Sequence, residues 1–107
     1  MAKKKIAEPE IDLSASYEDL LGVFAEARTP EDVKALFEDM FTESERRDFT
    51  IRWKLMNDLY RHVSQRTIAN ELHISLCRIT RGSRMLKKSD GYVRRLLEKR
   101  YDDHYQI

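Results

Sequence analysis

The segment SQRTIANELHISLCRITRGSRMLK, residues 64–87, decides the fold of this chain. Ser64 and Ser75 each stand before a run of apolar residues at helical spacing, as residues that cap a helix do. Only residues 73–75 separate the two runs, so the segment predicts two short helices joined by a tight turn, a helix-turn-helix over about 64–86. The apolar positions at the junction of the two helices are Ile68, Leu72, Ile74 and Ile79, with the small Ala69 where they cross.

The second helix of this pair has an outward side suited to the major groove of B-form DNA, which admits one α-helix. Its apolar and hydroxyl groups fit thymine methyls and base edges, and the basic side chains around it fit phosphates or guanine edges. We therefore predict that sequence preference is set by Arg66, Leu76, Cys77 and Thr80. We predict phosphate contacts from Arg78, Arg81, Ser83, Arg84 and Lys87.

The net charge of +1 hides an uneven distribution of charge along the chain. Residues 1–60 hold nine Lys or Arg and fourteen Asp or Glu, a net −5, whereas residues 61–100 hold eleven and three, a net +8. A nearly neutral chain with one strongly basic third is arranged to meet a polyanion with one surface. A basic face that is merely solvated is the alternative interpretation of the same distribution.

The composition favours helices, because the 107 residues include only 3 Gly and 2 Pro. We predict an all-α fold of about six helices. Residues 1–14 are predicted to be a mobile N-terminal arm, and residues 15–107 a single helical DNA-binding domain. The residues predicted to begin helices are Ser16, Thr29, Thr42, Ser64, Ser75 and Ser89.

Apolar residues at helical spacing define the candidate core, since large apolar rings in such patterns are mainly buried. For the first two helices these residues are Leu20, Leu21, Val23, Phe24, Ala27, Val33, Leu36, Phe37, Met40 and Phe41. For the third they are Phe49, Trp53, Met56, Leu59 and Tyr60, and for the last Val93, Leu96, Leu97 and Tyr101.

Several function classes are disfavoured by what the chain lacks. No apolar run approaches the roughly 18 residues of a membrane span, and the start of the chain is too acidic for a secretory signal. The single cysteine, Cys77, cannot form an internal disulfide, so we expect a cytoplasmic protein. The three histidines do not combine with Cys77 in a metal-binding spacing, and no glycine-rich phosphate loop is present, so we expect no metal site and no enzyme activity.

Four short matches give the chain a family resemblance: SQR at 64–66, NEL at 70–72, ITRGS at 79–83 and LK at 86–87. With this spacing the sequence resembles the tryptophan repressor family of helix-turn-helix regulators. The similarity continues weakly through residues 42–61 and the last helix and covers about two-thirds of the chain. Residues 1–30 match only in being helical.

The resemblance implies an intertwined, all-helical homodimer that presents one reading head per protomer to an operator in double-stranded DNA. It also implies L-tryptophan as corepressor, bound beside the reading head. By this similarity Arg52 and Arg81 would stack on the two sides of the indole, Gly82 would leave room for the ring, and the backbone of Thr42 would face the ligand amine. Guanidinium groups suit such a ligand, because they stack on aromatic rings and bind carboxylates.

Some positions depart from the family pattern and leave tryptophan binding open. Family members that bind tryptophan have a serine where Met85 stands, to help hold the amine, and small or branched apolar residues where Asp39, Phe41 and Trp53 stand. Asp39 could pair with the ammonium group, whereas Trp53 could fill the pocket with the protein's own indole. Two alternatives therefore stand beside a tryptophan-controlled repressor: a regulator of the same fold without a ligand, and a helical adaptor that meets an acidic protein.

Overall fold

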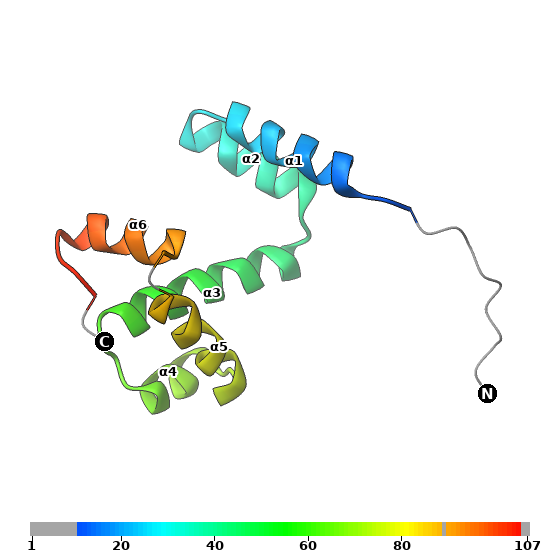
Figure 1. Ribbon diagram of the computed structural model, residues 1–107. Coiled ribbons are helices and arrows are strands. Elements are labelled where there is room, and N and C mark those ends of the chain that lie inside the picture. Colours follow the sequence, from blue (N-terminus) through cyan, green and yellow to red (C-terminus); the bar gives the residue numbers. More distant parts are fainter. Residues whose placement is uncertain (1–10, 89, 106–107) are drawn as a thin grey trace, which may run out of the picture. The chain divides into compact units, whose positions relative to one another are not determined.

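The computed structural model describes residues 11–88 and 90–105, and all regular structure within those residues is α-helical. Figure 1 shows the helices in chain order. Their bounds are α1 Ser14–Glu26, α2 Pro30–Met40, α3 Glu43–Tyr60, α4 Gln65–Leu72, α5 Leu76–Lys87 and α6 Tyr92–Tyr101. The predicted all-α fold is confirmed. The chain divides into two compact units, one ending at Phe41 and one beginning at Thr42.

The first unit begins its helices in two different ways. Thr29 caps α2 as predicted, because its hydroxyl accepts a hydrogen bond of 3.1 Å from the backbone N–H of Asp32. The prediction that Ser16 begins α1 is wrong by two residues: α1 begins at Ser14, whose N–H and hydroxyl both donate to Asp12. The predicted arm over residues 1–14 otherwise falls mostly on residues 1–10, which lie outside the described residues.

Three phenylalanines hold α1 against α2. The ring centroids of Phe24 and Phe37 are 5.5 Å apart, and those of Phe37 and Phe41 are 5.1 Å apart. Nevertheless no residue of α1 or α2 is buried within the single chain. The expectation that every apolar position is covered is wrong for Leu21, Val23 and Met40, which are exposed, because a hairpin of two helices is too small to enclose a core.

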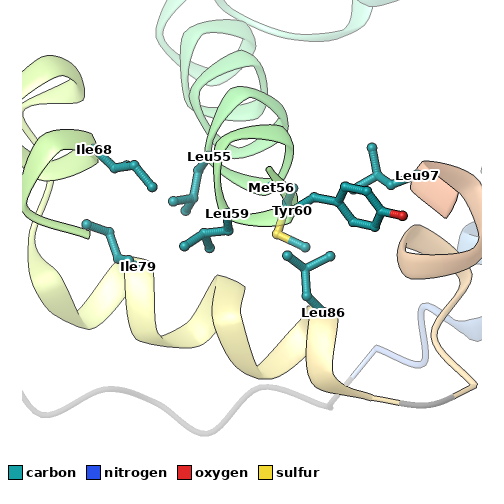
Figure 2. Close-up of a cluster of buried hydrophobic side chains, with 8 residues drawn as sticks. All are labelled: Leu55, Met56, Leu59, Tyr60, Ile68, Ile79, Leu86 and Leu97. Atoms are coloured by element: carbon teal, nitrogen blue, oxygen red, sulfur yellow. The ribbon is translucent and has the colours of Figure 1, made fainter. Parts of the chain in front are cut away.

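The second unit contains the buried core, shown in Figure 2. Met56, Leu59 and Tyr60 are buried as predicted, together with Leu55, which the pattern missed. Phe49 and Trp53 remain 39% and 37% exposed, because the buried positions of α3 begin only at Leu55. The other helices contribute Ile68, Ile79, Leu86 and Leu97 to the core.

The last helix starts later than predicted. Gly91 precedes α6 and has no side chain with which to cap it, while Ser89 lies outside the described residues. Leu97 is fully buried, but Leu96 is 38% exposed, so only part of the predicted apolar face is covered. Among the described helices, none combines the length and the apolar composition needed to cross a membrane.

Candidate nucleic-acid interface and ligand pocket

The helix-turn-helix is built as its two serine caps predict. The hydroxyl of Ser64 accepts a 3.1 Å hydrogen bond from the N–H of Thr67, and that of Ser75 accepts a 3.3 Å bond from the N–H of Arg78. Between them, His73 adopts a left-handed conformation with φ of 53° and ends α4. Each helix of the pair therefore begins with a hydrogen bond between residues three apart in sequence, and α4 ends at a left-handed residue.

The two helices are fixed to the rest of the second unit from the inside. Ile68 of α4 and Ile79 of α5 have no exposed surface. Figure 2 shows their side chains pointing toward Leu55 and Leu59 of α3. Ala69, Leu72 and Ile74 pack partly buried against the same core. The predicted junction is confirmed, and it leaves the opposite side of α5 free to meet a partner.

That opposite side of α5 is exposed to solvent. Leu76 is 59% exposed, and Cys77 and Thr80 are exposed as well. The Thr80 hydroxyl donates a 2.9 Å hydrogen bond to the carbonyl oxygen of Leu76, and its oxygen lone pairs remain able to accept. An apolar side chain, a thiol and a hydroxyl thus share one accessible ridge, which we call the α5 ridge (Leu76, Cys77 and Thr80).

Positive charge surrounds the α5 ridge. The exposed cations of α4 and α5 are Arg66, Arg78, Arg81, Arg84 and Lys87, and the half-buried Ser83 lies among them in sequence. Within the described chain, ion pairs join Lys54 to Asp58 and Arg94 to Glu98 but involve none of these cations. Helix α5 itself contains no acidic residue. The surface therefore keeps its full charge for a negatively charged partner.

A small pocket lies between α3 and α5. Its walls are Arg52, Leu55 and Met56 from α3 and Arg78, Arg81, Gly82 and Met85 from α5. The structure thus brings together four of the five residues proposed for a ligand, whereas Thr42 caps the start of α3 and is not on the pocket wall. The sequence reasoning missed Leu55, Met56 and Arg78, although helical spacing from Arg52 and Arg81 could have found them.

The pocket is narrow. Its volume is about 40 Å³, which holds a few water molecules, since one water needs roughly 10–15 Å³. Gly82 helps to set this width, because a Cβ there would lie 3.1 Å from Leu59 Cδ1 and 3.4 Å from Met56 Sδ. The lack of a side chain at Gly82 thus allows α5 to approach α3 closely.

Trp53 does not fill the pocket, so that interpretation of the sequence is wrong. Its indole lies under Arg100 of α6, whose guanidinium carbon is 5.5 Å from the ring centroid. The reason is helical geometry: successive residues point about 100° apart, so Trp53 is turned away from the side of α3 that carries Arg52. In the described residues, no group of His, Cys, Asp and Glu side chains is arranged to hold a metal ion.

The sequence of the chain also matches a family of known proteins. The family model described as "Trp repressor protein" matches residues 15–101, which include the helix-turn-helix and both walls of the pocket. The chain belongs to the Trp repressor family. Proteins of the Trp repressor family are DNA-binding transcriptional regulators rather than enzymes, so the predicted class of function is confirmed.

The relatives of this Trp repressor family member have modest sequence identity. Three proteins of Xylella fastidiosa, from strains 9a5c, M23 and Temecula1, are each named "Trp operon repressor homolog". Each is 30% identical over 86 residues, which cover 79% of this chain and 91% of the relative. No solved structure matches the chain significantly.

Proposed function

We propose that this protein is a sequence-specific repressor that inserts α5 into the major groove of its operator. The observation that carries the proposal is the α5 ridge: Leu76, Cys77 and Thr80 are exposed while Ile79, on the same helix, is completely buried. Because the buried Ile79 fixes α5 to the core, the opposite, exposed face of the helix is rigid. Such a face, surrounded by uncompensated cations, suits a groove lined by base edges and bounded by phosphates.

The side chains divide by the part of DNA that they reach. The α5 ridge and Arg66 read base edges and thymine methyls, because they combine apolar, hydroxyl and guanidinium groups. The residues that hold phosphates are Arg78, Arg81, Ser83, Arg84 and Lys87. The first turns of α4 and α5 add backbone N–H groups that favour an anion.

The protein acts as a homodimer in this proposal. Neither α1 nor α2 buries a single residue in one chain, and Leu21, Val23 and Met40 expose apolar surface on them. A second copy covers this surface in an intertwined dimer and places the two reading heads about one helical turn of DNA apart. Sedimentation at micromolar concentration should give twice the mass of one chain, and a monomer would contradict the dimer.

L-tryptophan is the proposed corepressor, and the pocket between Arg52 and Arg81 is its site. The two guanidinium groups supply planar cations for an indole and a carboxylate. The names of the Xylella relatives refer to the Trp operon, which supports the same ligand. The pocket is too narrow for an indole as it stands, so binding requires Met85, which is 40% exposed, to move aside.

A ligand-independent repressor is the second candidate, and the narrow pocket with Met85 on its wall favours it. The two candidates differ in how tryptophan affects the operator. With a corepressor, millimolar L-tryptophan increases operator affinity. Without one, affinity is the same with and without the amino acid, and calorimetry shows no heat of binding.

Selection of bound duplexes from random DNA, with and without L-tryptophan, tests the proposed function. The protein should enrich a pseudo-palindromic sequence and prefer it over bulk competitor DNA by about 10³ or more. A helical adaptor for an acidic protein would bind all duplexes weakly and lose that binding with added salt. Equal affinity for selected and bulk DNA would therefore overturn the proposal.

A further inference from the structure

The chain after α6 folds back against the end of α3. The Tyr60 hydroxyl donates a hydrogen bond to Asp103, and the backbone N–H of Tyr105 donates a 2.9 Å bond to Glu98 Oε2. Burial, followed by the bond to Asp103, raises the pKa of Tyr60 above its ordinary value. The bond from Tyr105 is the main cause that lowers the pKa of the Glu98 carboxyl group.

Four rings form a stack at this place. The centroids of Tyr101 and Tyr60 are 5.4 Å apart, those of Tyr60 and Tyr105 are 5.3 Å apart, and those of Tyr105 and His62 are 5.6 Å apart. The last pair is nearly parallel, with 4° between the ring planes. Tyr105, close to the end of the chain, therefore stacks both on the last residue of α3 and on the linker that follows α3.

This linker connects α3 to the helix-turn-helix of α4 and α5, which is the DNA-reading head of the proposed function. It consists of residues 61–64 and ends at Ser64, which caps α4. His62 adopts a left-handed conformation with φ of 63°, which is unfavourable for a residue with a Cβ and must be held by its surroundings. The N–H of Val63 donates a 2.9 Å bond to the carbonyl oxygen of Asp58, and the Tyr105 ring packs on the His62 ring.

The first turn of α4 lies between this linker and the core contacts of α4, which begin at Ile68. Ile68 is the only buried residue of α4, and Gln65, Arg66 and Thr67 are exposed. None of these three residues is part of the buried core or of the side chains packed against it. Arg66, which the proposed function assigns to base recognition, lies four residues beyond His62, between the linker and the buried Ile68.

We propose that Tyr105 is a positioning residue of the DNA-reading head: by stacking on His62 it holds the linker, and through the linker it places Arg66 for base recognition. This inference rests on the proposed function. Tyr105 itself makes no contact with DNA in this scheme. Tyr105 affects binding by positioning Arg66, so its loss lowers the preference for the selected duplex and leaves the general affinity for DNA unchanged.

A double-mutant cycle tests the coupling between the two residues. Tyr105→Leu keeps apolar bulk but removes the ring, and Arg66→Ala removes the guanidinium group. Each should lower affinity for the selected duplex by about tenfold and leave affinity for bulk DNA unchanged. The double variant should also lose about tenfold, because residues that act as a unit are not additive, whereas independent roles would give about a hundredfold.

Two further variants separate positioning from mere stability. Tyr105→Phe preserves the ring and should bind like the wild type. His62→Gly preserves the left-handed backbone, which glycine adopts freely, but removes the other ring of the pair. It should reproduce the loss of selectivity of Tyr105→Leu, and it serves in the same cycle if Tyr105→Leu does not fold.

The outcomes distinguish the inference from the proposed function. A wild-type chain without preference for any duplex overturns both. If the wild type is selective and Tyr105→Leu or His62→Gly keeps that selectivity, the inference alone is overturned. It is also overturned if these variants weaken selected and bulk DNA equally, or if the double variant loses the product of the two single effects.

Discussion

The backbone of Gly82 in α5 lies so close to α3 that a Cβ on it would come within 3.1 Å of Leu59 Cδ1. Leu55 Cδ2 would be 3.3 Å away on the same side, so the neighbouring atoms all belong to α3. Both leucines are buried. The contact between Gly82 and Leu59 therefore sets the distance between α5 and α3.

A larger side chain at this contact should force the two helices apart. We expect Gly82→Val to lower the free energy of unfolding by about 1–3 kcal/mol, as overpacked cores do. Gly82→Ala is the matched control and should change stability by less than about 1 kcal/mol, because alanine's higher helix propensity offsets the tighter contact. Urea unfolding followed by circular dichroism measures both, and a Gly82→Val variant as stable as the wild type would contradict the close approach.

Truncation of two apolar residues of α5 should affect different properties: the stability of the protein for Ile79 and its binding to DNA for Leu76. Ile79→Ala should cost about 2–5 kcal/mol of stability, since Ile79 is fully buried. Leu76→Ala should change stability by less than about 0.5 kcal/mol, since Leu76 is 59% exposed. Yet Leu76→Ala should weaken binding to the selected duplex. Equal loss of stability in the two variants, measured by thermal unfolding, would mean that the α5 ridge is wrongly placed.

Phosphate and base contacts should differ in their salt dependence. Lys87→Ala should weaken binding to every duplex alike and reduce the slope of log K against log salt by about 0.9, the effect of one lost phosphate contact. Arg66→Ala should instead relax preference at one base pair by about 1–3 kcal/mol. Fluorescence anisotropy over a range of salt concentrations measures both, and a uniform loss in both variants would refute this division of roles.

The helix-turn-helix could be predicted from sequence because local interactions build it. The caps at Ser64 and Ser75 act on backbone N–H groups only three residues away. The burial of Ile68 and Ile79 follows from the helical spacing of apolar residues. The exposure of Phe49 and Trp53 did not follow, because the same spacing occurs on both covered and uncovered parts of a long helix.

Contacts between distant parts of the sequence explain what the sequence analysis missed at the site. Similarity to a family located Arg52, Arg81, Gly82 and Met85 around one pocket, and the structure brings them together. The stacking of Tyr105 on His62 joins residues far apart in the chain. Neither helical periodicity nor capping patterns carry information about such a pair.

Met85 should limit the affinity for tryptophan. It lies on the wall of a pocket of about 40 Å³, and serine, the residue of tryptophan-binding family members, is smaller and able to accept a bond from the ligand amine. We expect Met85→Ser to increase L-tryptophan affinity by about tenfold or more. Calorimetric titration of both proteins measures the change. Equal measurable affinity in the two proteins would contradict the role given to Met85, and no heat of binding in either would argue for the ligand-independent repressor.

The accessibility of Cys77 to a maleimide reagent tests the central claim most directly. Cys77 is the single cysteine of the chain and lies exposed on the α5 ridge. If this ridge enters the groove, the selected duplex at about ten times its Kd should slow alkylation about tenfold, because only the free chain reacts. If Cys77 reacts at the same rate with and without saturating duplex, α5 is not the helix that reads DNA.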